Sequence, residues 1–155
     1  MKLLWIRRDS THWPGAADLR TRVFVGEQNV PPELELDEYD ATADHLVALD
    51  DDGVVRGTLR LLPYGEGDVK IGRVAVDAAL RGTGLGLALM REAFAEARRR
   101  NCGAAHLGSQ VTVVGFYEKL GFTAFGDVFD DAGIPHRHMV LLLDASGEIR
   151  EGESS

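Results

Sequence analysis

A glycine-rich run near the middle of the chain is the first place where the residue types indicate a ligand. It reads Arg81-Gly82-Thr83-Gly84-Leu85-Gly86, which we call the glycine loop, and it precedes a strongly amphipathic segment. Glycine lets the backbone turn tightly and expose successive N–H groups. At a helix start these groups lack partners and lie at the positive end of the helix dipole. Because Arg81 adds a planar charged guanidinium, the loop predicts a site for an anion with several oxygens, most simply a pyrophosphate.

Two common pyrophosphate motifs fit this loop poorly. A Walker loop needs lysine and then serine or threonine after its last glycine, whereas Gly84 is followed by Leu85 and Gly86. A dinucleotide-binding fingerprint that starts at Gly82 needs a third glycine where the chain has leucine. It also needs an acidic residue about 20 positions later, and Ala104–Leu107 carries none. A tight strand-to-helix turn without a ligand is the structural alternative.

A second run lies downstream, Gly115-Phe116-Tyr117-Glu118-Lys119-Leu120-Gly121-Phe122. It follows Val74-Ala75-Val76, the glycine loop, a predicted helix and a predicted strand, in that order. In this arrangement the chain resembles the GNAT superfamily of acyl-CoA-dependent N-acyltransferases, most strongly from Val69 to Phe122. The resemblance implies that the glycine loop binds the pyrophosphate of acetyl-CoA and that Tyr117 faces the CoA sulfur. Gln110 stands where many members have an asparagine that contacts the pantetheine arm.

Three shorter stretches extend the resemblance. Arg22–Gln28, Asp44-His45 and Gly133-Ile134-Pro135-His136 together resemble the small ElaA-like subgroup of the superfamily. This subgroup is defined by sequence better than by substrate, so it adds little about the acceptor.

The resemblance also implies how the donor is held and activated. Unpaired backbone groups of Val74 and Val76 would bind the pantetheine amides as an added strand would. The Val74 N–H would stabilise the oxyanion of the tetrahedral intermediate, and Tyr117 would protonate the departing thiolate. An amine would attack the thioester directly within a ternary complex, with no covalent enzyme intermediate and no metal. The predicted cofactor-binding residues are Val74, Ala75, Val76, Arg81, Gly82, Thr83, Gly84, Leu85, Gly86, Gln110 and Tyr117.

The base that removes a proton from the amine is left open by the sequence. Several family members use a carboxylate on the strand before the glycine loop, but that position lies near Lys70 here. The candidate bases are Glu27, His45 and His136, and Tyr117 completes the predicted catalytic set. Each candidate base has a structural alternative: a surface carboxylate, a packed or capping histidine, and a structural loop histidine.

The missing strand carboxylate also supports a rival function, a CoA-binding regulatory module without turnover. An acyltransferase with a longer acyl donor is a second rival, which only the volume of the cleft would decide. Cys102 is a poor candidate nucleophile because the negative end of the preceding helix dipole is expected to raise its pKa.

The elements that must position these residues alternate in a mixed pattern. Strands are predicted at 2–8, 45–50, 54–62, 69–76, 104–109, 122–129 and 138–143, and helices at 16–25, 85–100 and 112–120. Residues 26–44 are expected to be irregular with one short helix at most, because Pro31-Pro32 blocks a longer one.

The fold class that follows is a mixed α+β domain. The resemblance implies a GNAT fold, in which a central mixed, mostly antiparallel sheet splays into a V-shaped cleft and is flanked by helices. One strand pattern agrees independently. Val69 and Ile71 share one parity, whereas Val74 and Val76 share the other, and this change of phase predicts a bulge near Gly72-Arg73.

Length and composition fit one soluble domain. The chain has 155 residues, of which 45% are hydrophobic and 27% charged. We expect a single domain over residues 1–145 and a disordered tail over 146–155. A single cysteine excludes an internal disulfide and a cysteine-based zinc site. No apolar run reaches the roughly 20 residues of a membrane helix and no signal peptide is recognised, so the cytoplasm is the expected location.

The net charge of −8 argues against a nucleic-acid partner. Six carboxylates cluster in one short stretch: Glu33, Glu35, Asp37, Glu38, Asp40 and Asp44. This acidic segment is either a solvated loop or a rim that attracts a cationic molecule. The expected acceptor is therefore a primary amine, on a small molecule or as an exposed amino group, and a homodimer is left open.

Overall fold

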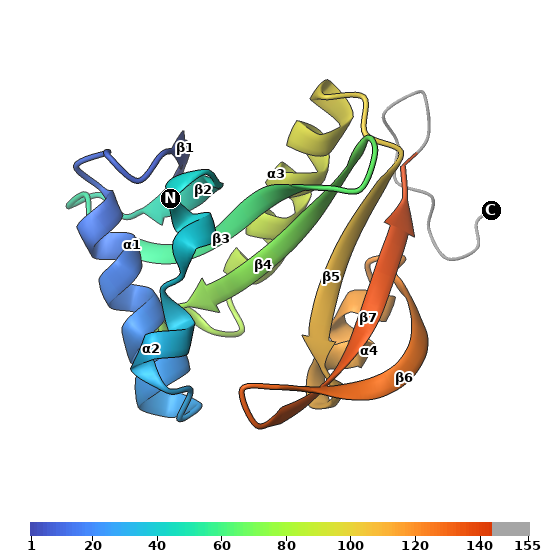
Figure 1. Ribbon diagram of the computed structural model, residues 1–155. Coiled ribbons are helices and arrows are strands. Elements are labelled where there is room, and N and C mark those ends of the chain that lie inside the picture. Colours follow the sequence, from blue (N-terminus) through green and yellow to red (C-terminus); the bar gives the residue numbers. More distant parts are fainter. Residues whose placement is uncertain (144–155) are drawn as a thin grey trace. The chain divides into compact units, whose positions relative to one another are not determined.

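The computed structural model describes residues 1–143 and contains a seven-stranded sheet (Figure 1). The strand order is β1-β2-β3-β4-β5-β7-β6, mostly antiparallel, with β4 and β5 parallel. The strands are β1 Lys2–Ile6, β2 Asp44–Leu49, β3 Val55–Tyr64, β4 Asp68–Val76, β5 Ala104–Gln110, β6 Thr123–Asp131 and β7 Ile134–Leu142. The predicted mixed α+β fold is confirmed, with shifted strand ends. The tail predicted for residues 146–155 lies outside the described residues.

The α-helices are α1 Trp13–Arg20, α2 Pro32–Glu35, α3 Leu85–Arg99 and α4 Val114–Glu118. The helix predicted over 16–25 begins earlier, with a proline in its first turn, and then widens into a π-helical segment, Thr21–Glu27. The helix predicted over 112–120 is shorter and follows a 3-10 turn at Val111–Val113. The acidic segment holds two short helical turns, α2 and a 3-10 turn at Glu38–Ala41. Within residues 1–143, no helix is long and apolar enough to cross a membrane.

The chain divides into two compact units. Among the described residues, the first comprises residues 1–62 and 71–93, and the second comprises residues 63–70 and 94–143.

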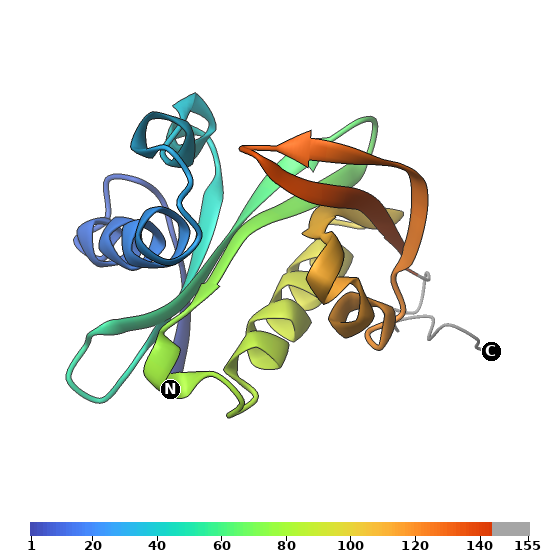
Figure 2. The same cartoon turned by 90° about the horizontal axis from the view of Figure 1, so that it is seen from below.

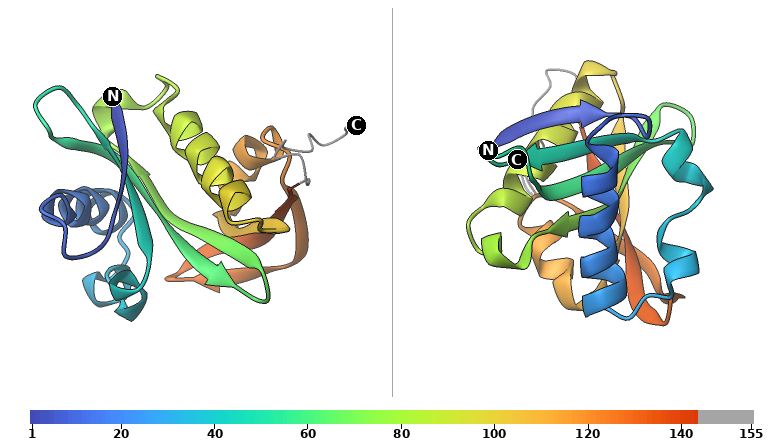
Figure 3. Two further views of the ribbon diagram at one scale, coloured as in Figure 1. Left: turned by 90° about the horizontal axis from the view of Figure 1, so that it is seen from above. Right: turned by 90° about the vertical axis from the view of Figure 1, so that its left-hand side faces the viewer.

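In the first unit, α1 and the first turns of α3 cover opposite faces of the strands (Figures 2 and 3). On one face, Leu19 from α1 belongs to a buried cluster with Val47 of β2. On the other face, a Cβ added to Gly57 would lie 3.0 Å from a methyl carbon of Leu89. Glycine at this position therefore allows α3 to approach β3 closely.

Strand β4 continues through Gly72-Arg73, where the sequence predicts a bulge, but its backbone conformation changes there. Arg73 has a φ of +52°, in the left-handed region that non-glycine residues rarely adopt. A Cβ added to Gly72 would lie 3.9 Å from the Arg60 Nε, and Arg73 shares the Asp37 carboxylate with Arg60. Two successive residues thus face the same side of the strand, as in a β-bulge. The left-handed backbone conformation costs an L-amino acid roughly 1–2 kcal/mol. Contacts with neighbouring residues must therefore hold Arg73 in this conformation.

In the second unit, β7 lies between β5 and β6 and pairs antiparallel with both (Figure 1). Gln110 of β5 lies opposite His136 of β7, and Phe129 of β6 is paired with the same histidine. Two predicted site residues far apart in the sequence therefore lie on neighbouring strands.

Candidate active site

The glycine loop joins β4 to α3 in the backbone conformation that its glycines predict. Gly82 and Gly84 have φ angles of +82° and +91°, which L side chains rarely adopt. A Cβ added to either would meet no described atom within 4 Å, so the space beside both backbones is open. Because α3 begins at Leu85, its first N–H groups have no carbonyl in a preceding turn. The loop therefore combines open space with backbone donors at a positive helix end.

Asp77 fixes the chain just before the glycine loop. Its Oδ1 accepts the Ala79 N–H at 3.0 Å, and its Oδ2 accepts Arg56 Nη1 at 3.0 Å. The hydrogen bond from the Ala79 N–H, followed by that from Arg56, holds the pKa of Asp77 below its usual value. The carboxylate is thus ionised at neutral pH and keeps both contacts.

Arg81 contacts two other predicted site residues. Its Nη2 lies 2.7 Å from Glu27 Oε1, with both side chains half exposed at 46% and 40%. Its Nε and Nη2 donate to the Val76 carbonyl at 3.2 and 3.1 Å. The sequence interpretation placed Glu27 at the amine end of the reaction and Arg81 at the phosphate end, yet the two form one ion pair. The Val76 carbonyl, predicted to pair with pantetheine, is bonded to Arg81 instead.

The other predicted acetyl-CoA-binding residues of the first unit have mainly their backbone groups available to a ligand. Ala75 and Leu85 direct their side chains into buried surroundings, at 2% and 7% exposure. Val74 is half-buried, and the Thr83 hydroxyl donates to the Leu80 carbonyl. Pairing with a ligand through backbone groups is compatible with all of these placements.

His45 lies in the interior, and its contacts favour the structural alternative. It is 1% exposed, and its Nε2 donates to the Asp40 carbonyl at 3.1 Å. Its ring packs against Trp13, with centroids 4.7 Å apart. Burial lowers the pKa of His45 from its ordinary value. A neutral, packed imidazole without solvent access is poorly placed to deprotonate an external amine.

In the second unit, Tyr117 of α4 is half-buried between two aromatic rings. Its ring meets Phe116 and Phe122 edge-on, with centroids 5.1 and 5.9 Å away. Burial raises the pKa of Tyr117 to about 12, because the phenolate would lose its hydration. The hydroxyl therefore stays protonated and is suited to donate a proton rather than accept one.

His136 is the candidate base with a defined, partly accessible imidazole. It is half-buried, and its Nδ1 lies 2.7 Å from the Ile134 carbonyl. Because a carbonyl only accepts hydrogen bonds, Nδ1 carries the hydrogen and the neutral ring has its lone pair on Nε2. This tautomer can accept a proton at Nε2.

A polar group around Lys70 was missed by the sequence interpretation. Lys70 pairs in register with His106 of β5, and His106 Nε2 lies 2.9 Å from Asp68 Oδ2. Tyr64 covers the same group, 4.6 Å from the His106 ring and 5.7 Å from Lys70 Nζ. The position where a strand carboxylate was expected therefore carries a lysine beside a histidine–carboxylate pair. Parallel strand pairing brings these residues together, and no local spacing signals it.

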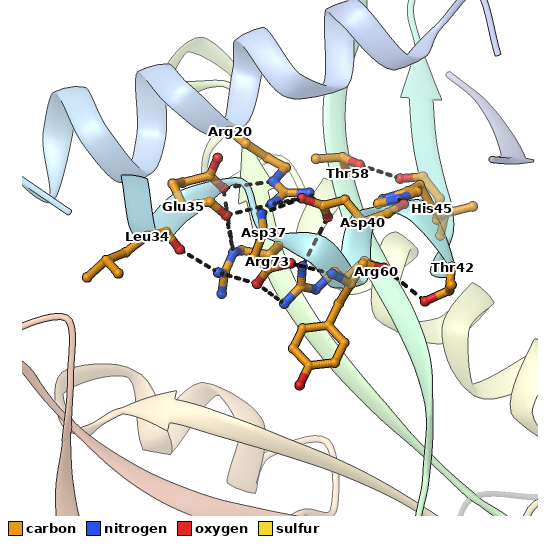
Figure 4. Close-up of polar contacts among 12 residues, drawn as sticks. Arg20, Leu34, Glu35, Asp37, Asp40, Thr42, His45, Thr58, Arg60 and Arg73 are labelled. Atoms are coloured by element: carbon orange, nitrogen blue, oxygen red, sulfur yellow. Dashed lines mark hydrogen bonds and ion pairs between the residues drawn. The ribbon is translucent and has the colours of Figure 1, made fainter. Parts of the chain in front are cut away.

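Three arginines hold the acidic segment in an arrangement that Figure 4 shows and that we call the arginine network. Arg20 Nε lies 2.8 Å from Glu35 Oε2, and its Nη1 lies 2.8 Å from Asp40 Oδ1. All three side chains are buried. The full set of charged members is Arg20, Glu35, Asp37, Asp40, Arg60 and Arg73.

The arginine network removes most of the charge that the acidic segment was expected to present. Burial would raise the pKa of Asp40, but hydrogen bonding and charge from Arg20 outweigh it and lower that pKa. In the same way, Arg60 outweighs burial and lowers the pKa of Asp37. Asp44 is also paired, 3.4 Å from Arg7. Among the six carboxylates, Glu33 and Glu38 are left without a recorded ion pair in the described residues.

The family match covers most of the chain: the acetyltransferase (GNAT) domain matches residues 15–143. The uncharacterized N-acetyltransferase YjcF of Bacillus subtilis is 34% identical over 123 residues, which are 79% of this chain and 86% of that protein. Protein ElaA of Escherichia coli is 35% identical over 123 residues, covering 76% of this chain and 79% of ElaA.

Solved structures agree with the family match. An acyl-CoA N-acyltransferase from Pseudomonas aeruginosa has a TM-score of 0.81 and 35% identity, over 90% of this chain and 97% of that one. The crystal structure of Escherichia coli ElaA has a TM-score of 0.78 and 29% identity, over 90% and 97% of the two chains. The resemblance seen in the motifs is thereby confirmed, and the chain belongs to the GNAT family of N-acetyltransferases, with ElaA-like proteins among its relatives.

Proposed function

We propose that the protein transfers an acetyl group from acetyl-CoA to a primary amine, on a small molecule or an exposed amino group, by direct attack within a ternary complex. The observation that carries this proposal is the glycine loop. Its two left-handed glycines border open space at the start of a 15-residue helix, beside a half-exposed arginine. Pyrophosphate fits that combination of backbone donors and positive charge.

The donor would be bound largely through the backbone. The N–H groups of the glycine loop would bind the pyrophosphate, and Arg81 would exchange Glu27 for a phosphate oxygen. The Val74 backbone, the Val76 N–H group and the Gln110 side chain would bind the pantetheine arm. The Val74 N–H would stabilise the oxyanion, a contribution of about 3–4 kcal/mol for a well-placed donor.

Tyr117 would donate the proton that the departing CoA thiolate takes up. A phenol with a pKa of about 12 is fully protonated at neutral pH, so Tyr117 always carries the proton that it would donate. Proton transfer to a thiolate, whose conjugate acid has a pKa near 8.5, is more uphill than from an ordinary phenol. Tyr117 would therefore act late, as negative charge accumulates on sulfur.

His136 is the proposed base, since its Nε2 lone pair is defined by the hydrogen bond at Nδ1. The other two candidate bases are less suitable, because Glu27 forms an ion pair with Arg81 and His45 is buried. His136 would take the proton from the ammonium before attack, directly or through one water.

A CoA-binding regulatory module remains the second candidate function, favoured by one observation. Lys70 occupies the place where several family members carry a catalytic carboxylate, and a protonated lysine cannot accept a proton. A longer acyl donor would use the same glycine loop, and donor chain length is tested by comparing acyl-CoA thioesters.

Binding and turnover are tested separately. Acetyl-CoA at about 100 times its Kd should stabilise the fold by roughly 2.7 kcal/mol, seen as a rise in Tm. Release of free thiol is then measured with a panel of primary amines, with carboxylate-rich and phosphorylated acceptors as comparators. No Tm shift at millimolar acetyl-CoA would refute the donor assignment. A shift without thiol release from any acceptor would support the regulatory module.

Tyr117→Phe tests the acid directly, because it removes one hydroxyl and little volume. If Tyr117 donates the proton, kcat should fall by about 10- to 1000-fold while the Tm shift with acetyl-CoA is kept. An unchanged kcat would leave Tyr117 as a packing residue.

A further inference from the structure

The bulge of β4 carries a charged side chain that the proposed reaction does not use. Arg73 stands in the left-handed region, with φ +52°, inside an otherwise extended strand. The next residue is Val74, whose N–H is proposed to meet the oxyanion. A strained residue persists only when its surroundings over-determine it, and such residues cluster at functional sites.

The Arg73 guanidinium makes three hydrogen bonds to one short segment of chain (Figure 4). Its Nε donates to the Glu35 carbonyl at 3.0 Å, and its Nη2 donates to the Leu34 carbonyl at 3.1 Å. Nη2 also donates to Asp37 Oδ2 at 3.2 Å. Two of the three acceptors are backbone carbonyls, so the contact fixes the path of the segment as well as its charge.

The segment that Arg73 grips is itself held from two other elements. Arg60 of β3 bonds both oxygens of Asp37, at 2.7 and 3.1 Å. Arg20 of α1 bonds the Glu35 carboxylate at 2.8 Å and the Glu35 carbonyl at 2.9 Å. Residues 34–37 therefore form a fixed anchor, because α1 and β3 both tie it down.

We infer that Arg73 is a positioning residue: by binding residues 34–37 it holds the β4 bulge in place and thereby sets the direction of the Val74 N–H. This inference rests on the proposed function. Arg73 acts through the backbone of its neighbour and has no contact with the reacting atoms in this role. A side chain that merely stabilised the fold would leave the response of Val74 to donor unchanged.

Backbone amide NMR with CoA and acetyl-CoA as the probes tests this inference. In the wild-type protein, acetyl-CoA should shift the amide resonances of Gly82, Gly84 and Val74. In Arg73→Ala, the two glycine resonances should shift as before, whereas the Val74 response should be lost. Turnover with the best amine of the panel should fall by about 100-fold, the scale of a misplaced catalytic group, with acetyl-CoA affinity retained.

Arg73→Lys and Arg99→Ala complete the comparison. Lysine keeps the positive charge but replaces the planar guanidinium with a single ammonium group. Compared with Arg73→Ala, Arg73→Lys should therefore retain part of the Val74 response and part of kcat. Arg99 pairs with Glu96 on the surface of α3, and its removal should change neither measurement.

The outcomes separate the inference from the proposed function. If acetyl-CoA shifts no glycine-loop amide in the wild-type protein, the proposed function fails. If Arg73→Ala keeps both the Val74 response and kcat while the glycine amides respond normally, the positioning role is overturned and the proposed function survives. If Arg73→Ala loses the glycine responses as well, the residue supports the whole unit, which also overturns the specific role.

Discussion

The glycine loop and the arginine network hold charge in opposite ways. The loop leaves the space beside Gly82 and Gly84 open and keeps its arginine half exposed. The network buries guanidinium groups among carboxylates, with Arg20 only 1% exposed. Buried ions lose their hydration and regain it only through close, well-oriented partners, whereas exposed donors keep their water until a ligand displaces it.

The two regions should therefore contribute differently to stability and to binding. The network uses side chains from α1, α2, the 3-10 turn that follows α2, β3 and β4, and its ion pairs form without a ligand. The loop offers backbone N–H groups at the start of α3, which a ligand would pair. Changes in the network should therefore alter the free energy of unfolding, and changes in the loop should alter the response to acetyl-CoA.

The largest effect is expected from Arg20→Ala. The change leaves Glu35 and Asp40 buried without their main partner, which should lower the free energy of unfolding by about 3–5 kcal/mol. Arg99→Ala removes a surface arginine paired with Glu96 and should cost less than about 1 kcal/mol. Urea denaturation of both variants measures the contrast, and equal losses would show that burial of the network adds nothing.

Gly84→Val should abolish the stabilisation by acetyl-CoA, a loss of about 2.7 kcal/mol at 100 times Kd. A β-branched residue cannot easily adopt φ +91° and would fill the space beside the backbone. Gly67→Val is the matched control, because Gly67 has φ +90° and equally open surroundings. Both variants should lose some stability, but only Gly67→Val should keep its Tm shift. A retained shift in Gly84→Val would place the ligand elsewhere.

His45 and the carboxylates of the network should make stability fall in acid in two stages. The folded pKa of His45 is lowered by burial, so the unfolded chain takes up a proton first as pH drops below about 6.5. Asp37 and Asp40 have folded pKa values below their usual one, so a further decline should begin below about pH 4. Unfolding free energies between pH 8 and 3 measure both stages. His45→Gln should remove the first and Asp37→Asn should reduce the second.

The smallest effect concerns the ion pair beside the loop. Glu27→Gln frees Arg81 for phosphate and should tighten acetyl-CoA binding by up to about fivefold, since an exposed pair is worth less than about 1 kcal/mol. Asp18→Asn removes a more exposed carboxylate that pairs with Arg22 and should leave affinity unchanged. Titration calorimetry compares the two. Weaker binding in Glu27→Gln would mean that the carboxylate orients Arg81 rather than competing for it.

The same contrast explains what the sequence could predict. The glycine loop was predictable because its chemistry comes from consecutive residues with fixed backbone preferences. The bulge at Arg73 was predictable because a change of side-chain parity appears within one strand. The sequence also placed His136 and Gln110 among the candidates, although only the pairing of β5 with β7 shows that they are neighbours.

The arginine network was not predictable by the same means. Its ion pairs join residues 15 to 38 positions apart, as between Arg20 and Glu35 or between Arg73 and Glu35. Charge counting interpreted the acidic segment as a rim for cations, since composition does not show which carboxylates are paired. Packing placed His45 in the interior against Trp13, where its ring no longer has the exposure that a base needs.

The contact between Arg81 and Glu27 also bears on ionic strength. A phosphate that replaces Glu27 exchanges one paired charge for another, so it releases few bound counterions from the protein. Binding of proteins to nucleic acid weakens steeply with salt because counterions condensed on the polyanion are released. Here the net charge of −8 adds a long-range repulsion toward a polyanion, which salt screens. Affinity for acetyl-CoA should therefore depend only weakly on salt, and association should become faster as salt is added.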